Sequence, residues 1–95
     1  MAPPQTNPAA IPQDLVNKVG SAAGRIVRIQ REYAAQAETE TADAREALAK
    51  RAQTAAEQAI GEQGITVHDY NTVLTAAEED QDLERRLLDV AREVL

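Results

Sequence analysis

The sequence has 95 residues, a length that allows one domain, and such a chain buries only about 60 to 65% of the surface that its unfolded form exposes. Its large apolar residues are almost all Ile, Leu and Val and alanine is abundant, which favours closely packed helices, while the lack of cysteine excludes disulfides and thiolate chemistry. Ten Lys and Arg against sixteen Asp and Glu give a net charge of -6, which argues against a general nucleic-acid binder because nonspecific affinity for phosphate needs a positive surface.

The first twelve residues, MAPPQTNPAAIP, are predicted to form a disordered tail. Their four prolines supply no amide donors and resist helix formation. The remaining residues, 13–95, are predicted to form a single helical domain. No run approaches the roughly 20 apolar residues of a membrane span, and the N-terminus lacks the layout of a secretion signal.

The first predicted helix begins near Leu15. Its apolar positions recur at alternating spacings of four and three, which is typical of an amphipathic or coiled-coil-like helix. They are Leu15, Val19, Ala22, Ile26, Ile29 and Tyr33. Gly20 and Gly24 interrupt this helix at about 1 kcal/mol each relative to Ala, and they indicate either tolerated weakness or a place where another backbone comes close.

A basic arc lies opposite that apolar seam. It consists of Lys18, Arg25, Arg28 and Arg31. One interpretation is a docking surface for an acidic partner or for anionic headgroups. The other is a solvated face whose charges pair with acids of the second or fourth helix.

The second predicted helix follows a turn over residues 36–42, which contain no large apolar residue. Asp43 is the expected N-cap, with Glu46 completing a capping-box pattern. One face then carries an alanine-rich stripe that allows a neighbouring helix to pack closely. The stripe consists of Ala44, Leu48, Ala52, Ala55 and Ala59.

The stretch GITVHDY, residues 64–70, contains the only histidine of the chain. Gly64 in the left-handed conformation would end the second helix and bring Ile65 back onto Ile60. Thr66 would then cap the third helix, with Asp69 bonding back to the cap amide and Tyr70 packing on Ile65 as a hydrophobic staple.

The same stretch also invites a catalytic interpretation. Successive helical residues point about 100° apart, however, so His68, Asp69 and Tyr70 cannot converge on one substrate from a single helix. A general acid or base also needs a partner within reach, and none is indicated. We therefore expect no catalytic, cofactor-binding or metal-binding residues, no cofactor, and no enzymatic activity.

The third predicted helix runs through Val73 and Leu74 to an acidic stretch in which Asp80 is the expected cap of the fourth helix. A calcium loop starting at Asp80 is rejected. An EF-hand needs Gly at its sixth position and Glu at its twelfth, where this chain has Arg85 and Ala91.

The fourth predicted helix has an unusually wide apolar arc of about 160°. It comprises a seam of Leu83, Leu87, Val90 and Val94, with Leu88, Ala91 and Leu95 beside it. Either neighbouring helices bury the whole arc, or Leu88 and Leu95 stay exposed and contact a second copy of the chain. The second alternative implies a homodimer or another protein partner.

Together these elements predict an all-α fold, a long helical hairpin followed by two shorter helices in a small four-helix bundle. From about Leu15 to the C-terminus the chain resembles the domain of unknown function 4168 family. The resemblance rests on Gly64-Ile65-Thr66-Val67, Tyr70-Asn71, Val73, Asp80, Leu83 and Val90, with Ile26, Ile29, Tyr33 and Ala59-Ile60 upstream. Members of that family are commonly made with a secretion signal, so the resemblance implies a periplasmic or secreted location.

These observations lead to two hypotheses about function. The first is an extracytoplasmic protein-interaction module whose contact surface includes Arg25, Arg28, Arg31, Leu88 and Leu95. The alternative is a periplasmic chaperone-like or carrier protein that holds apolar ligands or peptides in a groove between the hairpin and the final helices. Methionine, a common residue of promiscuous binding surfaces, occurs only at position 1, which favours the first hypothesis.

Overall fold

The computed structural model describes residues 11–95, and it folds them into four helices with no strand. These are α1 (Gln13–Ala37), α2 (Ala42–Glu62), α3 (Val67–Glu79) and α4 (Gln81–Val94). The predicted all-α class and the order of long hairpin and two shorter helices are confirmed. Most of the predicted tail, residues 1–10, lies outside the described residues.

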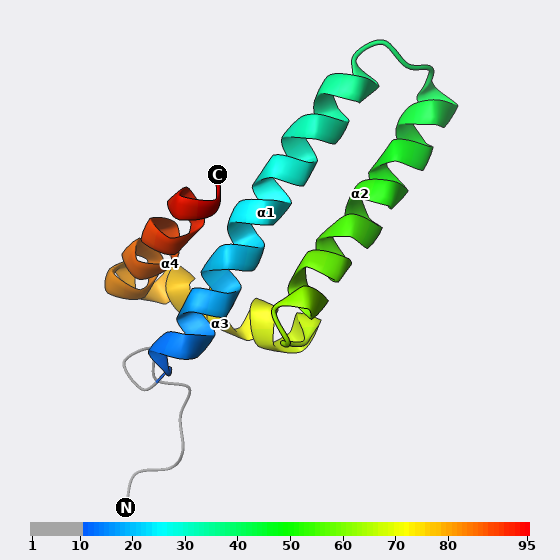
Figure 1. Cartoon of the computed structure of the whole chain (residues 1–95). Helices are drawn as coiled ribbons and strands as arrows, with labels where there is room; N and C mark the ends of the chain where they lie inside the picture. The colour runs from blue at the N-terminus through cyan, green and yellow to red at the C-terminus, as the bar shows by residue number, and fades with distance from the viewer. Residues whose placement is uncertain (1–10) are drawn as a thin grey trace, which may run out of the picture.

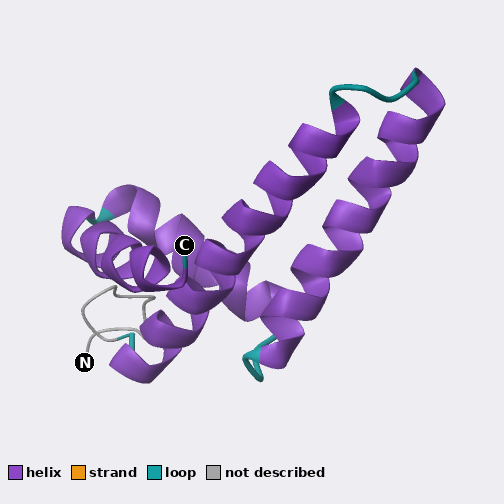
Figure 2. Cartoon of the chain, turned by 45° about the horizontal axis from the view of Figure 1, so that its top comes forward, coloured by secondary structure: helices purple, strands orange, loops and turns teal. Residues whose placement is uncertain are grey.

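The hairpin of α1 and α2 is the longest feature of the molecule, whose principal extents are 57, 24 and 23 Å. α3 and α4 pack only at the end of the hairpin where α1 begins, so the other half of the hairpin projects beyond them (Figures 1 and 2). α4 runs beside the first half of α1 and in the same direction (Figure 1). The bundle is therefore complete at one end of the molecule only.

The core consists of two neighbouring clusters. The larger one joins α1, α3 and α4 through Val16, Val19, Val73, Ala76, Ala77, Leu83 and Leu87. The smaller one joins α1 and α2 through Ala22, Ile26, Ala59 and Ile60. Ile65 and Tyr70 pack against both clusters, so the junction between α2 and α3 connects them.

That junction forms as the sequence predicts. Gly64 adopts a φ of +77°, and its amide donates to the carbonyl of Gly61 at 2.9 Å. The Thr66 hydroxyl accepts from the Asp69 amide at 3.0 Å, and the Asp69 carboxylate accepts from the Thr66 amide at 3.2 Å. These bonds confirm the capping box and the glycine stop.

The predicted N-cap of the second helix is wrong by two residues. The cap is Thr41, whose hydroxyl accepts from the Ala44 amide at 3.2 Å, and Asp43 lies in the first turn of α2. Arg45 Nε donates to the Ala37 carbonyl at 2.8 Å and so joins the start of α2 to the end of α1. Asp43 still stabilises the helix start, because its negative charge complements the helix dipole there.

Asp80 is the only residue between α3 and α4, and it caps α4 as predicted. It takes an extended conformation, with φ of -136° and ψ of 109°, and its carboxylate accepts from the amides of Asp82 and Leu83 at 2.9 and 3.2 Å. One extended residue makes a sharp corner between two helices. This corner turns α4 back along α1.

Candidate interaction groove

Two glycines of α1 allow α4 to pack closely against it. A Cβ placed on Gly20 would lie 2.7 Å from Cβ of Val90, and one placed on Gly24 would lie 2.6 Å from the carbonyl oxygen of Ala91. Real Cβ atoms do not approach other heavy atoms so closely. The structure therefore supports the second interpretation of these glycines, in which another backbone comes close.

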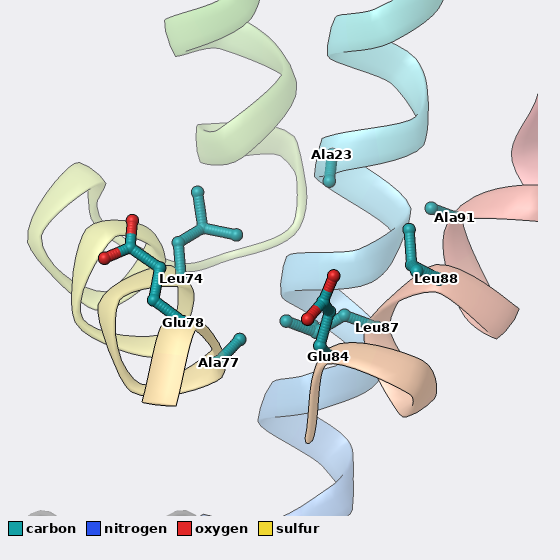
Figure 3. Close-up of a pocket in the computed structure, with 8 residues that line it drawn as sticks. All are labelled: Ala23, Leu74, Ala77, Glu78, Glu84, Leu87, Leu88 and Ala91. Atoms are coloured by element: carbon teal, nitrogen blue, oxygen red, sulfur yellow. The ribbon is translucent and has the colours of Figure 1, made fainter. Parts of the chain in front are cut away.

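This contact leaves a groove between α3 and α4, with α1 behind it. The groove has a volume of about 340 Å³ and is lined by Ala23, Leu74, Ala77, Glu78, Glu84, Leu87, Leu88 and Ala91. Figure 3 shows Leu74 of α3 on one side, Leu88 and Ala91 of α4 on the other, and Ala23 of α1 between them, with the Glu84 carboxylate between the two sides and the Glu78 carboxylate beyond Leu74. Its position between the hairpin and the final helices is where the carrier hypothesis expected an apolar groove.

The lining of the groove combines an apolar floor with two carboxylates. Apart from Glu78 and Glu84, every lining residue is alanine or leucine, and no lysine or arginine is among them. Neither glutamate takes part in an ion pair with another of residues 11–95. The groove therefore offers an apolar floor together with two carboxylates that have no ion-pair partner among the described residues.

The wide apolar arc of α4 is only partly covered by the other helices. Leu83, Leu87 and Ala91 are buried, whereas Leu88 is 45% exposed and Leu95 is 48% exposed. Leu88 lies at the edge of the groove, and Leu95 follows the last residue of α4. Of the two outcomes stated for the arc, the structure shows the one in which these leucines remain accessible.

Three residues of the predicted basic arc have polar partners within the chain. Arg25 pairs with Glu62 of α2 at 2.5 Å, and Lys18 pairs with Asp14 of its own helix at 3.1 Å. Arg28 donates to the Val94 carbonyl at 3.3 Å, at the C-terminal end of α4 where a cation complements the helix dipole. Arg31 is exposed further along α1, and the structure brings none of these residues into the groove.

The residues of the GITVHDY stretch each have a structural role or an exposed position. Hydrogen bonding from the Thr66 amide and then from its side chain lowers the pKa of Asp69, and burial raises the pKa of Tyr70. His68 is exposed. Within residues 11–95, no three or more His, Cys, Asp or Glu side chains are grouped so that they could hold a metal ion.

Most of the groove residues were not singled out by the sequence. Only Leu88 was named as a contact residue, and within the acidic stretch that contains Glu78 and Glu84 only Asp80 was given a role. Leu74 follows the buried Val73 in α3 and is itself only partly buried. Because successive residues of a helix point about 100° apart, this pair of apolar residues indicates that α3 has a second apolar face. That signal becomes specific only once the positions of α1 and α4 are known.

The fold and the groove define a class of small all-α proteins in which two short helices pack on one end of a helical hairpin. The chain belongs to the DUF4168 family, a domain of unknown function, whose sequence pattern matches residues 12–87. The match covers α1 to α3 and the first half of α4, and it ends at Leu87, one residue before the exposed Leu88. Comparison with curated proteins and with solved structures returned no significant match. No helix within residues 11–95 is both long and apolar enough to cross a membrane.

Proposed function

We propose that this protein is an extracytoplasmic protein-interaction module that receives its partner in the groove between α1, α3 and α4. The observation that carries the proposal is the apolar groove with the accessible Leu88 at its edge. Only three large apolar side chains of residues 11–95 are strongly exposed, Val67, Leu88 and Leu95, and of these Leu88 lines the groove. A concave apolar surface edged by charge is typical of contact sites on small domains.

The proposal includes no catalytic activity. Asp69 is engaged in the capping box, and Tyr70 packs against both core clusters. Successive residues of a helix point about 100° apart, so the position of His68 beside Asp69 on one helix supports a binding role rather than acid–base chemistry. In a binding protein, Asp69 and Tyr70 would only stabilise the fold.

The extracytoplasmic part of the proposal rests on the resemblance to a family whose members are commonly made with a secretion signal. Its test is fractionation of the native organism after the complete gene has been tagged at its own locus. We expect the product in the periplasm or the medium. Recovery of the product with cytosolic markers would contradict the extracytoplasmic location, but it would not affect the proposal that the groove binds a partner.

The interaction role is tested by site-directed photo-crosslinking in envelope preparations. A photoreactive residue replacing Leu88 is expected to crosslink one or a few proteins, and the same residue replacing Val67 is the matched control. Val67 is exposed to nearly the same fraction, 47% against 45%, but lies outside the groove. Equal crosslinking from both positions would show that proteins contact the surface nonspecifically rather than at the groove, and it would overturn the proposal.

The carrier or chaperone hypothesis is the second candidate, favoured by the nearly complete apolar lining of the groove. The volume of about 340 Å³ is at the small end of ligand sites, which run from about 300 to 1,000 Å³. A carrier is expected to copurify a ligand that mass spectrometry detects after extraction, and a chaperone is expected to crosslink many unrelated clients. A single crosslinked protein and no ligand would exclude both.

A further inference from the structure

We infer that the groove recognises a cationic amphipathic helix of a partner protein, whose apolar side chains occupy the floor and whose lysines or arginines meet Glu78 and Glu84. This inference rests on the proposed function and specifies the chemistry of the partner.

The negative charge of the groove favours a partner with positively charged side chains. Glu78 of α3 and Glu84 in the first turn of α4 are both exposed, and both line the groove. In Figure 3 the Glu84 carboxylate lies between the two helices and the Glu78 carboxylate lies at the rim, beyond Leu74. Of the cations along α4, Arg86 donates to Gln13, and Arg85 and Arg92 line a neighbouring surface that shares Glu84 and Leu88 with the groove but is not part of the groove lining. A lysine or arginine placed over this floor would therefore find two acceptors with no competing cation of this chain within the lining.

The same charges disfavour an anionic occupant. A fatty acid or an acidic phospholipid would bring its headgroup towards two carboxylates on a chain whose net charge is already -6. Like charges so placed suppress wrong partners, whereas opposite charges steer the correct partner into contact. The negative charge of the whole chain and that of the groove therefore favour the same class of partner.

The form of the groove suits a helix. Its walls are the two helices α3 and α4 and its floor includes Ala23 of α1, so a helix laid between the walls would extend the bundle by one member (Figure 3). A helix of this kind presents anchors at i, i+3 or i+4 and i+7 to a hydrophobic groove. Ala23, Ala77 and Ala91 keep the floor low enough to admit such anchors.

The experiment is a selection from a displayed library of random peptides of about 14 residues, close to four helical turns. The targets are the full chain, Leu88→Gln, the double variant Glu78→Gln/Glu84→Gln, and the control Glu57→Gln/Glu93→Gln, which removes the same charge from exposed positions outside the groove. We expect selected peptides to carry apolar residues at helical spacing together with excess lysine or arginine. Both groove variants should bind them more weakly, and the control should not.

The size of the effect is measured on one selected peptide by fluorescence anisotropy. Loss of two partly solvated ion pairs should weaken binding about tenfold at low salt, and added salt should reduce the difference between the full chain and the double variant. Circular dichroism of each variant establishes that it is folded.

The outcomes separate the two claims. Peptides that lose affinity with Leu88→Gln but carry no excess positive charge, and bind the double glutamine variant as well as the full chain, would overturn the cationic inference and keep the groove as an interaction site. Peptides that bind the full chain and Leu88→Gln equally would overturn both. Enrichment of acidic peptides would overturn the inference directly.

Discussion

At the scale of single residues, the left-handed backbone conformation of Gly64 ends α2 and allows α3 to begin. Its φ of +77° is readily adopted only by glycine, and a Cβ there would meet nothing within 4 Å, so conformation rather than space is the constraint. We predict that Gly64→Ala lowers the free energy of unfolding by about 1 kcal/mol or more, measured by urea denaturation. Gly64→Asn is the control, because asparagine tolerates the left-handed region better, and its cost should be smaller.

Thr66 begins α3 with a side-chain cap, and its replacement tests that cap. We predict that Thr66→Ala costs about 1 kcal/mol, because the Asp69 amide loses its acceptor. Thr75→Ala, at an exposed position within the same helix, should change stability by less than about 0.5 kcal/mol. Equal denaturation midpoints for the two variants would contradict the assigned start of α3.

Asp69 makes the same cap dependent on pH. Its pKa lies below the ordinary value of 3.8 because the Thr66 amide and side chain stabilise the carboxylate. A carboxylate with a lowered folded pKa contributes stability above its unfolded pKa and loses it as the pH falls through the folded value. We predict that the stability difference between the natural chain and Asp69→Asn is constant near neutral pH and shrinks below 3.8. A difference that did not change with acidification would show that Asp69 acts as a neutral hydrogen-bond partner.

These residue-scale features could be predicted because each depends on a few neighbours in sequence. Gly64, the Thr66–Asp69 pair and Asp80 all act within three residues of a helix end. The wrong cap at Asp43 has the same origin, since Thr41 and Asp43 are both competent caps. The choice between them depends on where the hairpin turn closes, and the contact of Arg45 with the Ala37 carbonyl helps to set that position.

At the scale of helices, the contact between α1 and α4 depends on the missing side chains of Gly20 and Gly24. We predict that Gly20→Ala and Gly24→Ala each lower the free energy of unfolding by about 1 to 3 kcal/mol, since an added methyl overpacks the contact. Gly24→Ala should cost more, because it meets the Ala91 carbonyl oxygen, whereas Gly20→Ala meets the side chain of Val90.

The control for both variants is another helical glycine. Gly61 of α2 has nothing within 4 Å of an added Cβ, so Gly61→Ala should stabilise the chain by up to about 1 kcal/mol through helix propensity. Stabilisation by all three substitutions in urea denaturation would show that α4 does not approach α1 closely.

The faces of α1 show why packing was less predictable than capping. Periodicity identified one stripe from Leu15 to Tyr33, but α1 packs against α2, α3 and α4. Val16, which is 0% exposed, was outside the predicted stripe and belongs to the cluster shared with α3 and α4. A helix with three neighbours has no single apolar face, so its second contact surface becomes visible only with the neighbours in place.

At the scale of the whole molecule, the groove exists because a close contact on one side of α1 leaves space on another. Seven of its eight lining residues come from the consecutive helices α3 and α4, and Ala23 comes from α1, so the groove forms only when the corner at Asp80 turns α4 back along α1. Leu88 was predicted as a contact residue because the arc of α4 is too wide for one neighbour to cover. Glu78 and Glu84 acquire a joint role only from the corner at Asp80.

The expected homodimer is best tested through Leu88, and the size of the available surface bounds its strength. Stable interfaces bury about 800 Å² on each partner, whereas the described residues expose only Leu88 and Leu95 on α4 as large apolar contacts. A twofold axis through Leu88 would place Glu84 of one copy opposite Arg92 of the other, because both lie four residues from Leu88. Two chains that each carry a charge of -6 repel one another, which offsets part of that attraction.

We therefore predict a monomer in dilute solution that dimerises weakly as concentration and salt rise, measured by light scattering over a concentration series. Leu88→Glu should remove the concentration dependence and remain folded, because a side chain that is 45% exposed has little packing to lose. Val67→Glu, at a similarly exposed position away from α4, should dimerise like the natural chain. A dimer that persists at all concentrations and survives Leu88→Glu would place the interface elsewhere, and unfolding of Leu88→Glu would place Leu88 in the core.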